Sequence, residues 1–368
     1  MEGSMSSFLN RGSVMRYAVL VGKGLRNGTS NGWKNIGDYV QSLAGAQYLP
    51  QIDEYFDREN PCATGENIKM IMNAWYMWNP DRFPICKRII PLPVSMHISP
   101  MIKDDVFKNS SVIDWFKKNE PIGCRDKGTE SLLKSKGIDC YFSGCLTLTL
   151  GKKYKFNGER KGLVFVDPYI ASVRKELSFI ETLSSVFLGL LHAKTLSKIL
   201  RKFNHHYFIG HFGWLKRFIY SSIFIKTYCK WFSLRELADA EFISHMVKVG
   251  EGTELQTEGQ KMAYAENLVK KYARASLVVT GRIHCALPCL GIETPVIFTV
   301  GHALEEGSES SSAGRFGGLI DFFNVARIKK LKASGDFEFP VKNKDFYKPY
   351  AEELDKKCTV FMQEAAND

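Results

Sequence analysis

An arginine and a histidine stand two residues apart after a short apolar run, at Arg282 and His284. The run LVVT at 277–280 has the composition of a buried strand, and Gly281 breaks it. In α/β proteins, residues at the carboxyl end of such a strand line the ligand crevice. Arginine binds carboxylate or phosphate through a fixed fork of donors, and histidine transfers protons near neutral pH. The pair therefore predicts a site for an anionic substrate and for proton transfer.

A second group of polar residues lies far upstream, in the segment NIGDYVQSLA at 35–44. It follows an expected strand at 17–21 and a polar, glycine-rich loop at 22–34. Asn35 or Asp38 can cap the helix that begins here. The first N–H groups of that helix would then face the crevice and favour an anion. The same pattern also fits a capped helix without a ligand.

The third group is the pair Arg125-Asp126, between an expected strand at 121–124 and an expected helix at 127–136. With a further strand at 139–142 it reads as a βαβ unit that has polar residues at its strand ends. Such a pair is also typical of a weak surface ion pair. Three more polar residues lie at or just after the ends of expected strands at 68–74 and 89–95, and are expected at the same crevice: Asn73, Ser95 and His97.

Taken together, these segments resemble the polysaccharide pyruvyl transferase family. The matching motifs are NIGDYVQ at 35–41, IGCRD at 122–126, SGCLTLT at 143–149, GRIH at 281–284, ALPCLG at 286–291 and TPVI at 294–297. Each motif is short, and their order and spacing over roughly residues 16–325 carry the resemblance.

The resemblance implies an α/β protein in which two Rossmann-like domains face a cleft, the GT-B arrangement. A chain of 368 residues with 45% apolar content can bury two cores. In the second domain we expect helices at 235–247, 258–274 and 285–291. The expected organisation is a disordered extension at 1–15, an N-terminal domain at 16–155, a C-terminal domain at 160–342 with a basic, aromatic helical insertion at 174–234, and a helix at 343–368 that packs back toward the first domain.

The resemblance also implies the substrates: phosphoenolpyruvate, and a sugar with two suitably placed hydroxyls that becomes a cyclic pyruvate ketal. Convergent arginines suit the carboxylate and phosphate of that donor. We expect His284 as the general acid for the methylene carbon, and Asp38 or Asp126 as the general base for the hydroxyls. The residues expected to bind substrates are Arg282, Arg125, Asn35, Gly37, Gln41, Ser143 and Arg315.

We expect no cofactor and no metal, with phosphoenolpyruvate acting only as co-substrate. His284, Cys285 and Cys289 supply fewer than the four ligands of a structural zinc site. The nine cysteines contain no CxxC pair, which fits reduced thiols in the cytoplasm. The first 15 residues are polar and lack the apolar core of a signal peptide.

The positive charge of the chain, +11 overall, is concentrated in the insertion. Between Glu181 and Glu236 there are nine Lys and Arg residues, many aromatic residues, and no Asp or Glu. Such a segment is typical of an anionic membrane interface, although its apolar runs are too short to cross a bilayer. We expect four basic residues to bind the membrane: Lys216, Arg217, Lys226 and Lys230.

A membrane-bound insertion favours a lipid-linked oligosaccharide as acceptor, and a cytoplasmic protein that is peripheral at the inner face of the cytoplasmic membrane. The alternative is an insertion whose rings pack on the second domain while its Lys and Arg side chains snorkel to water. Nucleic acid is not expected as a partner, because the segment has no recognisable binding motif.

Two other functions fit parts of the sequence. A GT-B glycosyltransferase that uses a nucleotide sugar would need a carboxylate for the ribose, for which Glu305-Glu306 is a weak candidate. A membrane-associated scaffold without activity would use only the insertion, and it would tolerate replacement of Arg282 and His284.

Overall fold

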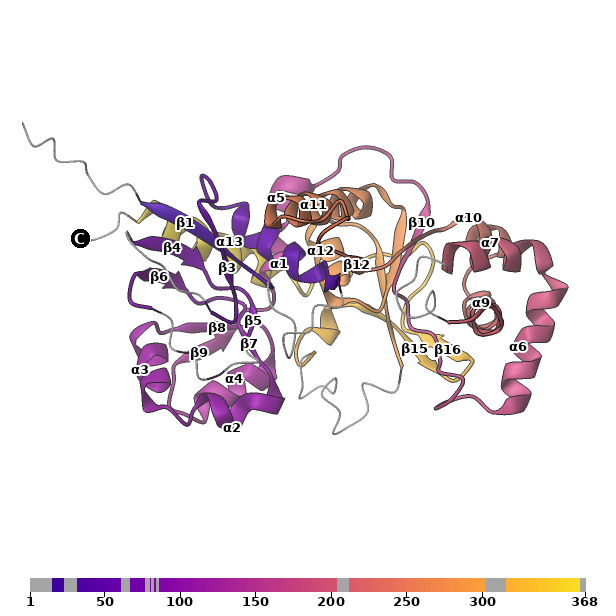
Figure 1. Ribbon diagram of the computed structural model, residues 1–368, viewed down its shortest axis with the longest axis horizontal. Coiled ribbons are helices and arrows are strands. Elements are labelled where there is room, and N and C mark those ends of the chain that lie inside the picture. The colour runs from indigo at the N-terminus through magenta and orange to yellow at the C-terminus, as the bar shows by residue number, and fades with distance from the viewer. Residues whose placement is uncertain are drawn as a thin grey trace, which may run out of the picture.

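The computed structural model describes residues 15–22, 32–60, 67–76, 80, 83, 86–203, 212–301 and 316–364. It is an α/β structure built on two mainly parallel sheets, which lie next to each other along the long axis of the molecule (Figure 1). The expected extension at 1–15 lies outside the described residues, apart from Met15.

The first sheet has four parallel strands in the order β3-β1-β4-β6. Every residue of β4 is buried, as expected for a strand that is covered on both faces. Two short parallel pairs extend this half of the molecule, β5 with β7 and β8 with β9. The elements are β1 (Arg16–Val21), β3 (Glu54–Asp57), β4 (Ile68–Ile71), β5 (Trp75–Tyr76), β6 (Ile89–Leu92), β7 (His97–Ile98), β8 (Ile122–Cys124) and β9 (Cys140–Phe142), with the helices α1 (Gly37–Ala46), α2 (Lys103–Val106), α3 (Ser110–Lys118), α4 (Lys127–Lys134) and α5 (Gly151–Tyr154).

The second sheet has the order β11-β10-β13-β14-β15-β16, and only its last strand is antiparallel. Strands β10 and β13 are in register up to Val166 and Thr280, so the chain leaves both at the same edge of the sheet. The elements are β10 (Leu163–Val166), β11 (Glu241–Ile243), β13 (Leu277–Thr280), β14 (Val296–Val300), β15 (Asn324–Lys329) and β16 (Lys332–Gly335), with the helices α11 (Glu258–Arg274) and α12 (Ile283–Gly291).

Several elements join the two halves. Strand β2 (Trp33–Asn35) pairs antiparallel with β12 (Met246–Lys248), and α1 packs against α11 and α12. The last helix, α13 (Lys348–Gln363), reaches the first sheet, where the Phe361 carbonyl accepts a 2.9 Å hydrogen bond from Lys69 Nζ on β4. One hydrophobic core therefore includes residues from both halves.

Most of the expected elements are present, but the prediction of a helix at 235–247 is wrong. Helix α11 has the expected bounds, because a capping box of Thr257 and Gln260 begins it. The expected helix at 235–247 ends at Asp239 as α10 (Leu234–Asp239), and β11 and β12 follow. Residues 241–243 pair with β10 as the edge of the second sheet, and this tertiary contact overrides the local helix preference.

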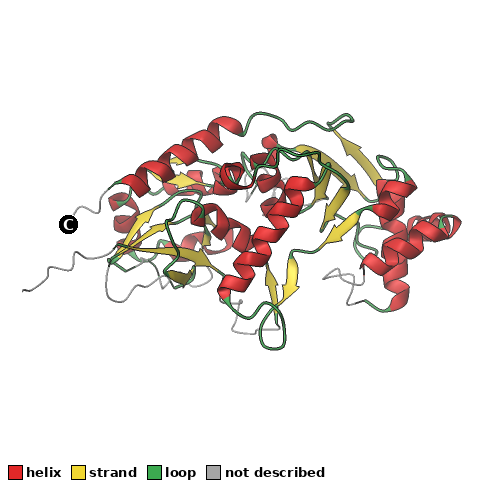
Figure 2. Cartoon of the chain, turned by 90° about the horizontal axis from the view of Figure 1, so that it is seen from above, coloured by secondary structure: helices red, strands yellow, loops and turns green. Residues whose placement is uncertain are grey.

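The insertion is helical and lies at the end of the molecule away from the first sheet, in α6 (Phe179–Leu191), α7 (Ala193–Phe203) and α9 (Trp214–Tyr228) (Figures 1 and 2). Many of its rings are buried against the second sheet. Phe224, Tyr228 and Phe232 surround Phe165 of β10 with ring centroids 5.0, 5.3 and 5.7 Å away. These rings are thus part of the core of the second half.

Candidate functional site

A network of hydrogen bonds occupies the edge where β10 and β13 end. Asp167 follows β10 with a φ of 39°, a conformation that non-glycine residues rarely adopt. Its Oδ2 accepts hydrogen bonds from Arg282 Nε at 2.7 Å and from the backbone N–H of His245 at 2.9 Å. The Thr280 hydroxyl accepts from the Arg282 N–H at 2.9 Å. Arg282 is thus fixed through its Nε, and within the described residues its two terminal nitrogens make no hydrogen bond.

Gly281 lets this network form, because there is no room for a side chain beside β10. A Cβ atom at this position would lie 2.9 Å from the Asp167 carbonyl oxygen, which already accepts a hydrogen bond from the Gly281 N–H. Close packing therefore explains why this position of the GRIH motif is a glycine. The close approach brings Arg282 near Asp167.

His284 lies where α12 begins, and it meets the start of α1 from the other half of the molecule. It is 7% exposed, and its backbone departs from helical geometry within α12. A Cβ atom on Gly37 would lie 3.0 Å from His245 Nδ1, 3.1 Å from Asn35 Oδ1 and 3.2 Å from His284 Cβ. Glycine at this position therefore allows both histidines to approach the first turn of α1.

His245 is a member of this site that the sequence interpretation missed. It is buried, and its Nε2 lies 2.8 Å from the Tyr272 hydroxyl. Burial lowers the pKa of His245, the charge of Asp167 raises it and that of Arg282 lowers it, and the net result is a pKa of about 4. The imidazole is therefore neutral at pH 7. Because residues 235–247 were expected to form one helix, His245 was not recognised as a residue that follows a strand.

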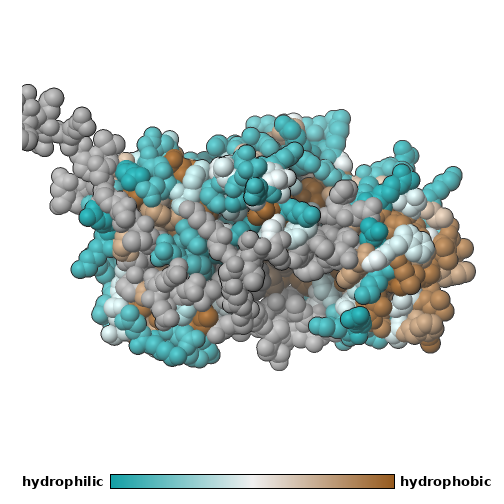
Figure 3. Space-filling model, in the orientation of Figure 1, coloured by the Kyte–Doolittle hydropathy of each residue, from teal (hydrophilic) through white to brown (hydrophobic). Residues whose placement is uncertain are grey.

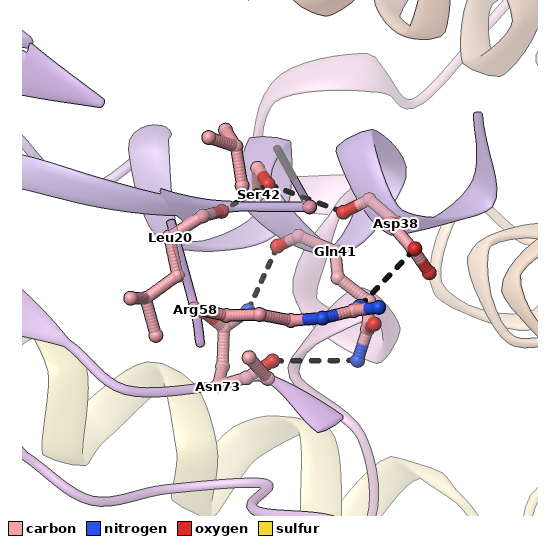
Figure 4. Close-up of a pocket in the computed structure, with 9 residues that line it drawn as sticks. Leu20, Asp38, Gln41, Ser42, Arg58 and Asn73 are labelled. Atoms are coloured by element: carbon pink, nitrogen blue, oxygen red, sulfur yellow. Dashed lines mark hydrogen bonds and ion pairs between the residues drawn. The ribbon is translucent and has the colours of Figure 1, made fainter. Parts of the chain in front are cut away.

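The start of α1 carries a carboxylate and a neighbouring cation. The helix begins after Ile36 without a side-chain cap, contrary to expectation, although Asn35 Oδ1 accepts a hydrogen bond from the Gly37 N–H at 3.1 Å. Asp38 Oδ2 lies 3.1 Å from Arg58 Nη1, and Figure 4 shows the two side chains pointing toward each other at the edge of a small pocket. Sequence reasoning missed Arg58, because no motif contains it.

Arg125 is the buried cation of the first half. Its side chain follows β8, and the residue is 2% exposed. Its Nε has no hydrogen-bond partner among the described residues, and Asp126 Oδ2 lies 3.7 Å from it. Burial lowers the pKa of Arg125, and the charges of Asp126 and Asp38 act in the opposite direction. The effect of Asp38 shows that Arg125 lies within electrostatic reach of the start of α1.

Both carboxylate oxygens of Asp126 have a polar partner within the protein. Its Oδ1 caps α4 by accepting from the Thr129 N–H at 2.9 Å, and its Oδ2 lies 2.5 Å from His97 Nδ1. Burial raises the pKa of Asp126, but His97, Arg125 and the cap outweigh this and leave the pKa below its usual range. The carboxylate is therefore ionised and holds His97 in place.

Four other predicted residues hold the first half together. Asn73 Nδ2 donates to the Gln41 carbonyl at 2.8 Å and Gln41 Nε2 donates to the Asn73 carbonyl at 3.3 Å, which ties α1 to the segment after β4 (Figure 4). The Ser143 hydroxyl donates to the Cys124 carbonyl at 3.0 Å and accepts from the Ser95 N–H at 3.2 Å. Ser95 is fully buried and has a φ of 54°.

Two expectations lie outside the described residues, Arg315 and the pair Glu305-Glu306. The chain returns near the site directly after this gap, since the Gly317 carbonyl accepts a 3.0 Å hydrogen bond from the N–H of Lys127 at the start of α4. In the part of the chain that is described, no three His, Cys, Asp or Glu side chains gather as a metal cluster.

The site as a whole combines three guanidinium groups with a carboxylate and two histidines. Arg282 and His284 come from the second half, and Arg125 and Arg58 come from the first. Asp38, at the start of α1, pairs with Arg58, and its charge acts on Arg125. Such a set can bind an anion with more than one charged group and transfer protons beside it.

A model of the polysaccharide pyruvyl transferase family matches residues 35–302, most of the chain. The matched range includes Asn35, Asp38, Arg125, Arg282 and His284. No curated protein and no solved structure matches the chain significantly. Because the family model matches most of the chain, including these residues of the site, the chain belongs to the polysaccharide pyruvyl transferase family.

Proposed function

We propose that this protein transfers pyruvate from phosphoenolpyruvate to a sugar of a cell-surface polysaccharide, or of its lipid-linked precursor, and forms a cyclic ketal. One observation carries the proposal: His284 meets the start of α1 beside the Asp38–Arg58 ion pair, and Asp167 holds both Arg282 and the backbone of the neighbouring His245. In this proposal the two halves are Rossmann-like domains in a GT-B arrangement, and the site lies in the cleft between them.

The donor carries a phosphate and a carboxylate, and the site offers separate cations for them. Arg125 is buried, so an anion that reaches it meets a guanidinium in an environment of low dielectric constant, where charged hydrogen bonds are strong. Arg282 is already anchored by Asp167 and has its terminal nitrogens available. The first N–H groups of α1 and the Arg58 guanidinium add positive potential between the two.

The chemistry begins with a proton on carbon. His284 donates a proton to the methylene carbon of the donor, which becomes a methyl group and leaves an oxocarbenium-like centre at C2. One sugar hydroxyl adds to C2 and loses its proton. The C2–O bond to phosphate then breaks, and the second hydroxyl adds and closes the ring. Of the two hydroxyl protons, one replaces the proton given to the methylene carbon, and the other leaves with phosphate.

Asp38 is the general base of the proposal. Its side chain is 21% exposed, so a sugar hydroxyl can reach it, and the ion pair with Arg58 orients the carboxylate. Asp126 is the other candidate, but both of its oxygens are engaged with Thr129 and His97. We therefore assign Asp126 a positioning role beside Arg125.

The proposal needs no cofactor, with phosphoenolpyruvate as co-substrate. It places the protein in the cytoplasm, where this donor is made, at the inner face of the cytoplasmic membrane. The eight cysteines in the described part of the chain are free thiols, which supports a reducing compartment.

The test is to incubate the purified protein with phosphoenolpyruvate and lipid-linked oligosaccharides, and to follow phosphate release together with the mass of the product. We expect both phosphate and a product heavier by one pyruvate ketal. Nucleotide sugars serve as control donors. Sugar transfer from a nucleotide sugar, with no phosphate released from phosphoenolpyruvate, would show a glycosyltransferase instead.

A further inference from the structure

Helix α6 has its small residues inside and its large apolar residues outside. Its buried residues are Ser185 and Gly189, and a Cβ atom on Gly189 would lie 2.4 Å from the Ser222 hydroxyl of α9. A surface helix of a soluble protein shows the opposite pattern, whereas close helix contact through small residues is typical of helices in lipid. The side chains turned outward are Phe179, Ile180, Leu183, Phe187, Leu190 and Leu191, each between 55% and 80% exposed.

The outer apolar surface includes the first turn of α9. Trp214 and Leu215 are 63% and 62% exposed there. Helix α9 runs antiparallel to α6, since Lys226 lies beside Ser184 and Ser222 beside Gly189. Figure 3 shows the brown side chains gathered at this end of the molecule. Soluble monomers rarely expose an apolar surface of this extent without a partner.

Cations are exposed on the two helices that pack against α6. Lys194 and Arg201 on α7 and Lys216 on α9 are exposed, and the only acid on α6 is Glu181, at its start. Two copies of this chain that met through the same surface would bring these cations together. An anionic lipid surface would instead attract them, at a depth where tryptophan is also favoured.

The length of the helix determines how it can meet a bilayer. Among the described residues, no single helix is long and apolar enough to cross a membrane, and α6 and α7 satisfy the length and composition only as a pair bent by 110°. With 13 residues, α6 is about 20 Å long, shorter than the hydrocarbon core of about 30 Å. It therefore suits a position parallel to the membrane.

We propose that the outward face of α6 and the first turn of α9 form a membrane-binding surface that lies at the boundary between headgroups and acyl chains of an anionic bilayer. This assigns the contact mainly to apolar side chains, whereas the sequence pointed to four basic residues, Lys216, Arg217, Lys226 and Lys230. Lys226 Nζ turns inward to the Ser184 hydroxyl at 2.5 Å, and Lys230 Nζ donates to the Ala333 carbonyl at 2.5 Å. Lys216 lies over the Phe212 ring at the edge of the surface.

The experiment is flotation of the full chain with vesicles of phosphatidylcholine and phosphatidylglycerol. The variant carries Ile180→Ser and Phe187→Ser, which replace outward side chains and leave the contact with α9 intact. The control is Phe346→Ser, since Phe346 is 65% exposed and lies before α13, in another region. We expect the parent and the control to float, and the double variant to bind at least about tenfold more weakly at an unchanged melting temperature.

Other results would contradict the proposal or part of it. A parent chain that stays at the bottom of the gradient at low salt, or a double variant that floats like the parent, would overturn the proposal. Equal binding to vesicles of phosphatidylcholine alone would overturn the anionic preference. A dimer seen by light scattering without vesicles, and broken by the same two substitutions, would show that a second copy covers the surface.

Membrane binding and the proposed transfer reaction can be measured separately. Vesicle binding needs no substrate, and donor binding and phosphate release with a soluble acceptor need no vesicles. If both proposals hold, the double variant keeps its activity on the soluble acceptor and loses activity on the lipid-linked one.

Discussion

The two strand-end regions that form the site are prepared for a substrate in different ways. In the second half, Asp167 holds Arg282 and the His245 backbone by hydrogen bonds of 2.7 and 2.9 Å, so this region is assembled without a ligand. In the first half, Arg125 is 2% exposed, and its Nε has no hydrogen-bond partner among the described residues. Burying a charge with few hydrogen bonds costs free energy, which a bound anion would recover. The GRIH and IGCRD motifs thus give one arginine held by a 2.7 Å hydrogen bond and one buried arginine whose Nε makes no hydrogen bond within the described residues.

The largest effect is expected for His284→Ala, because we propose that His284 is the general acid of the reaction. Loss of a general acid lowers the rate about 10² to 10⁴-fold. The measurement is kcat with a soluble acceptor, together with the melting temperature, and His192→Ala at the end of α6 is the matched control. Turnover like that of the parent at unchanged stability would remove His284 from the chemistry.

The next effect concerns the pH dependence of stability, through His245. Its pKa in the folded protein is about 4, against 6.5 for an ordinary histidine, so the unfolded chain binds a proton between these values and the folded chain does not. Stability therefore falls as the pH drops from about 6.5 to about 4, and His245 contributes about 3 kcal/mol to that fall. Urea unfolding of the parent and of His245→Gln across this range gives the difference. Identical pH profiles would contradict the buried neutral imidazole.

A smaller effect is expected when the anchor in the second half is removed. Arg282→Met leaves the carboxylate of Asp167, which is 5% exposed, without its charged donor. We expect a loss of about 1.5 to 3 kcal/mol in the free energy of unfolding, in addition to weaker donor binding. Arg274→Met is the control, since Arg274 is exposed in the last turn of α11. If the two variants are equally stable, Asp167 does not depend on Arg282.

Local patterns predicted the elements that hold the site, and tertiary contacts determined the rest. The apolar run before Gly281 indicated β13 and placed Arg282 at a strand end, as observed. His245 and Arg58 were missed, because their positions depend on the pairing of β11 with β10 and on the ion pair with Asp38. No periodicity within a segment carries such information.

The insertion illustrates the same limit. Its charge and its rings are visible in the sequence, but which face of a helix is buried depends on the partner. Ser185 and Gly189 of α6 fit against Ser222 of α9, and this contact turns the phenylalanines and leucines of α6 outward. Composition predicted a membrane-binding segment, whereas only the packing shows which of its side chains are exposed.

Calorimetric titration of phosphoenolpyruvate into the parent and into Arg125→Met tests the central claim most directly. If Arg125 is the buried anion site, the variant loses at least about tenfold in donor affinity, because charged hydrogen bonds of about 1.5 to 3 kcal/mol each are removed. Its free energy of unfolding stays the same or rises, because the substitution removes a buried charge with few hydrogen bonds. A variant that binds the donor as tightly as the parent would show that Arg125 serves only the fold.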